Sequence, residues 1–196
     1  METVNIMIVG VGGQGTLLTS RVLGGVIDQA GYDVKLSEVH GMAQRGGSVV
    51  TFVRYGDKVY EPIVEEGRAD ILIAFERLEA LRYAHFLKDE GAIICNDQRI
   101  DPMPVVTQLE EYPENILENL REKGIKLVSV DAMTEALNLG NKRVFNVIIL
   151  GILSKHMDLD ESIWKDVIRK TVPEKTIDIN IQAFEKGREL VDDLGL

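Results

Sequence analysis

A glycine cluster constrains this chain most strongly, because it stands between a short apolar run and a helical pattern. Residues 5–9 are too apolar to leave one face in water and predict a buried strand. Gly10–Gly15 follows directly, and Thr16–Ala30 then repeats apolar residues at helical spacing. A strand, a glycine turn and a helix in this order predict the opening unit of an α/β fold with parallel strands.

The glycine turn can serve either of two purposes. Its glycines fit the G-x-G-x-x-G pattern, which lets a backbone approach a phosphate while the helix N-terminus offers free N–H groups. The candidate contacts for an anion or an interface are then Gly10, Gly12, Gly13, Gln14 and Gly15. In the alternative, the same residues only shape a tight strand-to-helix turn. The sequence leaves both open.

A dinucleotide site is a specific form of the first possibility. It needs an acidic residue after the second strand, and Glu38 lies near the end of the strand predicted over 34–39. Nothing else in the chain resembles a substrate domain for hydride transfer. A stand-alone NAD- or nucleotide-binding protein of the Rossmann type is therefore the alternative function.

A second glycine-rich loop, His40–Gly47, follows that strand. Its Gln44 and Arg45 stand beside Gly46 and Gly47, and arginine suits a two-pronged contact with a carboxylate or phosphate. Open α/β sheets bind ligands beyond the carboxyl ends of their strands, so two such loops at one edge suggest a shared site. The alternative is a flexible loop with a solvated arginine. His40, as a lone histidine, favours a structural role.

The remaining pattern continues the α/β fold as one domain over residues 1–196. We expect a β-hairpin insertion made by a strand over 48–54, a turn and a return strand at 59–60. Further strands are predicted over 70–75, 91–95 and 125–130, with a short one at 105–106, and helices over 77–88 and 115–123. The fold class is α/β, a Rossmann-like, mostly parallel sheet flanked by helices.

The C-terminal region is predicted to be helical from residue 132 onward. The segment 143–156 is apolar on nearly every side, so its helix lies in the core or against a partner. Amphipathic helices are expected over 161–170 and 176–191, separated at Pro173.

Composition excludes several function classes. The chain has a net charge of −10 and no basic stripe in its sequence, so it is not expected to bind nucleic acid or an anionic membrane surface. Cys95 is the single cysteine, which excludes an internal disulfide and an iron–sulfur cluster with about four thiolate ligands. His85 and His156 show no metal-ligand spacing, so no metal site is expected. With no signal peptide or bilayer-length apolar run, the expected location is the cytoplasm.

The two loops together carry a resemblance to a known family. The turn Gly10–Gly15, followed by Gly41–Val49 with its Gln-Arg-Gly-Gly core, resembles the gamma-type domain of pyruvate/2-oxoacid:ferredoxin oxidoreductases, and most closely the beta subunits of its indolepyruvate branch. Asn146, Leu150-Gly151 and the run from Pro173 through Gly187 also resemble this family. The resemblance therefore covers nearly the whole chain.

The resemblance implies a division of labour between two subunits. A larger alpha subunit is expected to bind thiamine diphosphate, Mg and the iron–sulfur clusters, none of which this chain binds alone. The complex decarboxylates and oxidises a 2-oxoacid, passes electrons to ferredoxin and transfers the acyl group to coenzyme A. This chain then completes the active site, with Arg45 and Gln44 contacting the 2-oxoacid carboxylate or a coenzyme A phosphate.

Overall fold

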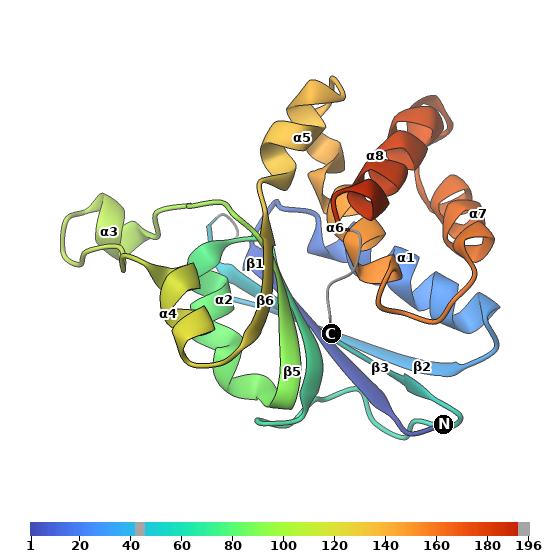
Figure 1. Cartoon of the computed structure of the whole chain (residues 1–196), viewed down its shortest axis with the longest axis horizontal. Helices are drawn as coiled ribbons and strands as arrows, with labels where there is room; N and C mark the ends of the chain where they lie inside the picture. The colour runs from blue at the N-terminus through green and yellow to red at the C-terminus, as the bar shows by residue number, and fades with distance from the viewer. Residues whose placement is uncertain (42–45, 192–196) are drawn as a thin grey trace.

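The computed structural model describes residues 1–41 and 46–191, which form one six-stranded sheet covered by helices (Figure 1). Its strand order is β2-β3-β1-β4-β5-β6. The strands are β1 (Val4–Val11), β2 (Asp33–His40), β3 (Ser48–Gly56), β4 (Ala69–Ala74), β5 (Leu87–Asn96) and β6 (Lys126–Val130). β1, β4, β5 and β6 pair in parallel, whereas β3 runs antiparallel to both β1 and β2. The predicted α/β class with a mostly parallel sheet is confirmed.

The helices cover both faces of this sheet. They are α1 (Thr16–Gln29), α2 (Arg77–Tyr83), α3 (Met103–Val106), α4 (Ile116–Glu122), α5 (Ala132–Asn138), α6 (Phe145–Ser154), α7 (Glu161–Thr171) and α8 (Ile177–Glu189). Figure 1 shows α1, α6, α7 and α8 over one face and α2 and α4 over the other. The C-terminal region is helical, as predicted.

Two apolar clusters result from the alternation of side chains along the central strands. Ile6 and Ile8 of β1 face the cluster formed with α1, α6, α7 and α8, while Met7 and Val9 face the cluster under α2 and α4. All four side chains are fully buried. This burial fixes the strand register, because a slip by one residue would exchange the two faces.

The hairpin is made by other strands than the sequence suggested. β3 pairs with β2 across the 41–47 loop and with β1, and residues 59–60 form no strand. As the sequence pattern predicted, β3 interrupts the alternation of strands and helices along the chain. The expected return strand was wrong because Asp33 in β2 accepts the Val59 N–H at 2.9 Å, which fixes this segment outside the ladder.

Two further expectations are corrected. Residues 105–106 belong to the short helix α3, not to a strand, because Pro104 stands in its first turn, where the fixed φ of proline suits a helix. The helix expected over 77–88 ends at Tyr83, and β5 already begins at Leu87 with three exposed residues before its buried part.

The apolar helix α6 lies in the core of this chain. All ten of its residues are buried, packed against α8, α5 and α1. It is therefore not available as the centre of a partner interface. Among the described residues, no helix combines the length and apolarity required to cross a membrane.

Candidate functional site

The glycine turn lies at the carboxyl end of β1 and opens directly into α1. Gly15 is the N-cap residue, with a left-handed backbone at φ 85°. A Cβ at this position would overlap the side-chain nitrogen of Asn146, which donates to the Gly15 carbonyl at 3.3 Å. Glycine is thus required at residue 15 both by the backbone angle and by the approach of α6.

Gln14 braces the turn from inside. Its Oε1 accepts the Val11 N–H at 2.7 Å, and its Nε2 donates to the Phe75 carbonyl at 2.9 Å and to Gln98 Oε1 at 3.1 Å. The side chain is 8% exposed. These bonds tie the turn to the end of β4, so the Gln14 amide holds the loop in shape.

Asn96 extends this bracing network to the helical layer. It is fully buried at the end of β5, donates to the Phe75 carbonyl at 3.1 Å and accepts the Ala132 N–H at the start of α5 at 3.1 Å. The carboxyl ends of β1, β4 and β5 are thereby connected through amide side chains. No short motif marks Asn96, so the sequence did not identify it.

An open pocket of about 460 Å³ lies in front of the glycine turn. Its lining residues come from the β1–α1 turn, the segment after β5, the helices α1, α5 and α6, and the α5–α6 connection: Gly13, Gln14, Gly15, Leu18, Gln98, Met133, Lys142, Arg143, Phe145 and Asn146. The first turn of α1 carries no acidic side chain. The N-terminus of α1, with the positive end of the helix dipole, lines this pocket together with the cationic Lys142 and Arg143.

Asn146 leaves one buried polar atom without a partner at this pocket. The residue is 3% exposed, and its Oδ1 has no hydrogen bond among the described residues. A buried acceptor without a donor costs about 1–3 kcal/mol. The sequence marked Asn146 only through the family resemblance.

The second glycine-rich loop lies beside the first, as expected. The Gly12 N–H donates to the Gly47 carbonyl at 2.9 Å, and the Gly41 N–H donates to the Ser48 carbonyl at 3.1 Å. Gly46 has a left-handed backbone at φ 74°. Gln44 and Arg45 lie outside the described residues, and His40 is described only as the last residue of β2. Gly10 pairs with Val49 in the ladder.

A buried carboxylate lies where β3 leaves this loop. Glu79 of α2 accepts a hydrogen bond from the Ser48 hydroxyl, whose oxygen is also 3.1 Å from that of Tyr83. Burial raises the pKa of Glu79, although the Ser48 hydrogen bond and Arg82 oppose this change. Ser48 is thereby held in place directly after the loop.

Glu38 does not occupy the position that a dinucleotide site needs. In that type of site, the acidic residue follows the strand next to the glycine turn. Here β3 lies between β1 and β2, and Glu38 accepts a hydrogen bond from Thr51 of β3 at 3.4 Å. The geometry therefore gives the NAD alternative no support.

Among the described side chains, Cys95, His85 and His156 form no cofactor-binding cluster. Cys95 is fully buried in β5, and burial raises its thiol pKa well above the ordinary value, so the thiolate is disfavoured. His85 lies 3.6 Å from Glu66, and His156 follows α6. Within residues 1–41 and 46–191, no group of three His, Cys, Asp or Glu side chains could hold a metal ion. The residues present do not fit an iron–sulfur cluster.

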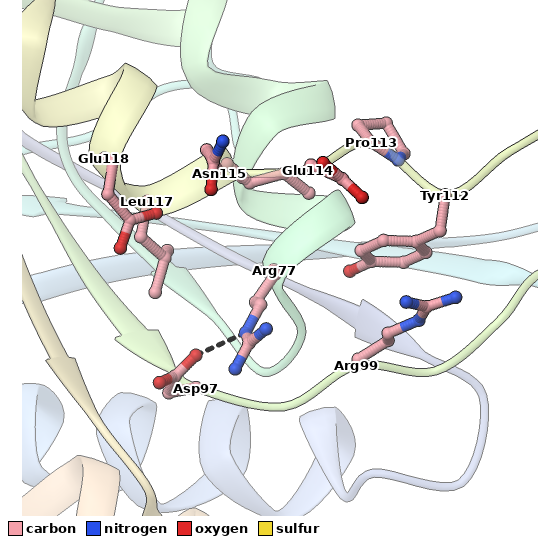
Figure 2. A pocket seen from close by; sticks show the side chains of 10 residues that line it. Arg77, Asp97, Arg99, Tyr112, Pro113, Glu114, Asn115, Leu117 and Glu118 are labelled. Atoms are coloured by element: carbon pink, nitrogen blue, oxygen red, sulfur yellow. Dashed lines mark hydrogen bonds and ion pairs between the residues drawn. The ribbon is translucent and has the colours of Figure 1, made fainter.

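A second pocket, of about 340 Å³, lies between the start of α2, the segment after β5 and the start of α4 (Figure 2). Arg77 pairs there with Asp97, and the Arg99 guanidinium lies 4.4 Å from the Tyr112 ring centre. Arg99 also pairs with Asp101 at 2.6 Å. Both guanidinium groups are thus already neutralised within the chain.

Known proteins resemble this chain over nearly its full length. Its residues 5–190 match the family described as pyruvate ferredoxin/flavodoxin oxidoreductase. It is 44% identical over 194 residues to the indolepyruvate oxidoreductase subunit IorB of Thermococcus kodakarensis, with 95% of both chains covered.

Solved structures agree on the fold. The pyruvate oxidoreductase subunit PORC of Thermotoga maritima superposes with a TM-score of 0.73 at 22% identity, covering 96% of this chain and 97% of that one. A 2-oxoglutarate:ferredoxin oxidoreductase of Magnetococcus marinus gives a TM-score of 0.76 at 22% identity, covering 97% of this chain but 31% of the longer one. The chain belongs to the pyruvate ferredoxin/flavodoxin oxidoreductase family.

Proposed function

We propose that this chain is the small subunit of a 2-oxoacid:ferredoxin oxidoreductase that acts on indolepyruvate or another aryl pyruvate and forms an acyl-CoA. The 44% identity to an indolepyruvate oxidoreductase subunit supports this assignment. Thiamine diphosphate, Mg and the iron–sulfur clusters belong to a larger alpha subunit, because the one buried cysteine of this chain cannot supply the cluster ligands.

The pocket at the glycine turn carries the proposal for this subunit's own role. It combines a helix N-terminus, Lys142 and Arg143 with an apolar wall that includes Leu18, Met133 and Phe145. Coenzyme A presents the matching groups, since its phosphates are anionic and its adenine ring and pantetheine arm are partly apolar. The glycine turn holds the anionic part.

The Gly41–Gly47 loop brings the second contact. Its described residue Gly47 accepts the Gly12 N–H of the glycine turn. The proposed roles of Gln44 and Arg45 are to bind the 2-oxoacid carboxylate or a coenzyme A phosphate. Closing this edge against the larger subunit also excludes water from the reacting groups.

The chemistry itself belongs to the partner's cofactors. Thiamine diphosphate supplies the decarboxylation of the 2-oxoacid, and the clusters carry its electrons to ferredoxin. This chain binds and orients the acyl acceptor beside that centre. Orientation of a bound reactant lowers the entropic part of the barrier, so a subunit without cofactors still controls turnover.

The pocket is tested by removing its two exposed cations in the assembled complex. We expect Lys142→Ala with Arg143→Ala to raise the KM for coenzyme A about tenfold, because two exposed, solvent-screened ionic contacts contribute about 0.5–1 kcal/mol each. The KM for the 2-oxoacid stays near that of the wild type. The matched control, Lys155→Ala with Lys175→Ala, removes the same charge from exposed positions outside the pocket. An unchanged KM for coenzyme A would contradict this site.

The loop is tested separately through Arg45. We expect Arg45→Ala to reduce kcat/KM about tenfold or more while the complex stays assembled, since a two-pronged contact with an anion is lost. A rise in the KM for the 2-oxoacid alone assigns Arg45 to the carboxylate, and a rise in the KM for coenzyme A alone assigns it to a phosphate. Unchanged kinetics with all 2-oxoacids tested would remove Arg45 from the site.

A further inference from the structure

A short arm projects from the body of the molecule between β5 and α4. It comprises residues 100–114 and contains α3, which Figure 1 shows at the far left, away from both helical layers. Three large apolar side chains are exposed on it: Met103 at 68%, Val106 at 59% and Leu109 at 81%. They lie within seven consecutive residues, whereas scattered single apolar side chains are normal on a protein surface.

The base of the arm is clamped to the sheet. Both of its ends bind the buried carboxylate of Glu76, whose Oε1 accepts from the Ile100 N–H at 3.1 Å and from the Tyr112 hydroxyl. The Arg99 guanidinium stacks over the Tyr112 ring, as Figure 2 shows. The arm therefore keeps a fixed position relative to the core.

The tip is also ordered by its own hydrogen bonds. The Val106 N–H donates to the Pro102 carbonyl at 3.0 Å, and the Leu109 N–H donates to the Pro104 carbonyl at 2.9 Å. Thr107 closes the turn with a hydroxyl bond to the Met103 carbonyl at 2.8 Å. An apolar tip that is rigid before binding loses little conformational entropy in an interface.

The charge of the arm indicates what covers it. Residues 100–114 contain four acidic side chains and no basic one, and the acidic ones are Asp101, Glu110, Glu111 and Glu114. All four are exposed, and Asp101 pairs with Arg99 at the base of the arm. Like charges across an interface are costly, so the complementary surface is an apolar socket bordered by Lys and Arg. A second copy of this chain, with its own net charge of −10, is a poor match.

We propose that this arm is the anchor by which the chain docks to the larger subunit, with Leu109 at the centre of the contact and Glu110 and Glu111 facing basic side chains of the partner. This inference rests on the proposed function, because that function supplies the partner. It concerns assembly and not the chemistry, so the two are tested by different measurements.

The test measures the affinity of the full-length chain for its purified larger subunit. We expect Leu109→Ser to weaken binding about 30-fold, the effect typical of a central apolar anchor, and Leu109→Ser with Met103→Ser to weaken it further. Leu137→Ser is the matched control, because Leu137 is 57% exposed on α5. At saturating concentrations of the variant chain, turnover returns to the wild-type value.

The acidic border has its own matched pair of variants. Glu110→Lys with Glu111→Lys weakens binding about tenfold in low salt and less at higher ionic strength, because exposed charges are screened there. Glu65→Lys with Glu66→Lys reverses another exposed acidic pair, outside the arm, and leaves binding unchanged.

Wild-type affinity in the Leu109→Ser, Met103→Ser chain overturns the docking proposal. So does a loss of self-association of this chain with no change in its affinity for the larger subunit. A wild-type complex that assembles through the arm but lacks coenzyme A-dependent turnover overturns the proposed function and leaves the docking proposal standing.

Discussion

Gly15 and Asn146 lie 131 residues apart in the sequence and contact each other at the glycine turn. The G-x-G-x-x-G pattern predicted a tight turn next to a helix, and the structure confirms it. The pattern could not show that Asn146 fills the space above Gly15, because this contact depends on how α6 packs against α1. Local spacing thus predicted the turn, and tertiary packing determines the pocket.

Gly15→Ala isolates the cost of this contact. We expect it to lower the free energy of unfolding by more than Gly31→Ala, measured by urea denaturation. Both positions have positive φ, at 85° and 89°, and share a backbone cost of about 1–2 kcal/mol. A Cβ at Gly31 meets open space, whereas one at Gly15 must displace the Asn146 side chain. Equal losses for the two variants would show that Asn146 yields without cost.

Glu79 gives a residue-scale prediction in pH. Its pKa is raised by burial above the ordinary value of 4.5, so the folded state binds the proton more tightly than the unfolded state. The stability that this proton contributes is fully present below pH 4.5 and is lost as pH rises through the folded pKa. We expect Glu79→Gln to gain stability relative to the wild type over that interval, measured by chemical denaturation at several pH values. A relative loss over the same interval would contradict this.

At the scale of elements, α6 and α8 cross at two glycines. A Cβ at Gly151 would overlap the Phe184 carbonyl, and one at Gly187 would overlap the Ile148 carbonyl. The two backbones therefore approach more closely than side chains would allow. The apolar pattern of residues 143–156 predicted a buried or partner-facing helix but could not choose between them, and the glycine contact with α8 decides for the core.

Gly187→Ala tests this crossing. We expect a loss of about 2–3 kcal/mol in the free energy of unfolding, because the added methyl group meets backbone that can move only with its helix. Gly124→Ala is the comparison. A Cβ at Gly124 meets open space, so the only cost there comes from the positive φ of 81°. A Gly187→Ala chain as stable as the wild type would mean that the helices separate freely.

The elements that the sequence predicted poorly share a physical cause. β5 begins with Leu87 to Glu90, where three residues are exposed, so only its buried part had the apolar pattern of a strand. α3 has four residues between turns, too few for any periodicity. Elements that bury one face or both were predicted with nearly correct bounds, as α1 and β4 show.

At the scale of the whole molecule, the insertion of β3 between β1 and β2 matters most. A dinucleotide site needs the second strand beside the glycine turn, and here β3 separates β2 from β1. The loop between β2 and β3 is thereby brought against the glycine turn through the Gly12–Gly47 hydrogen bond. The sheet edge therefore carries two adjacent glycine-containing loops instead of the strand arrangement of a dinucleotide site. The docking arm, residues 100–114, follows the end of β5.

The central claim is that this chain works as the small subunit of a 2-oxoacid:ferredoxin oxidoreductase. The most direct measurement is anaerobic purification of the tagged chain from its native cells, with the eluate assayed for reduction of a viologen dye. We predict a brown complex with a larger subunit whose activity requires both an aryl 2-oxoacid and coenzyme A. A colourless chain that purifies alone, under conditions that preserve such complexes, would contradict the claim.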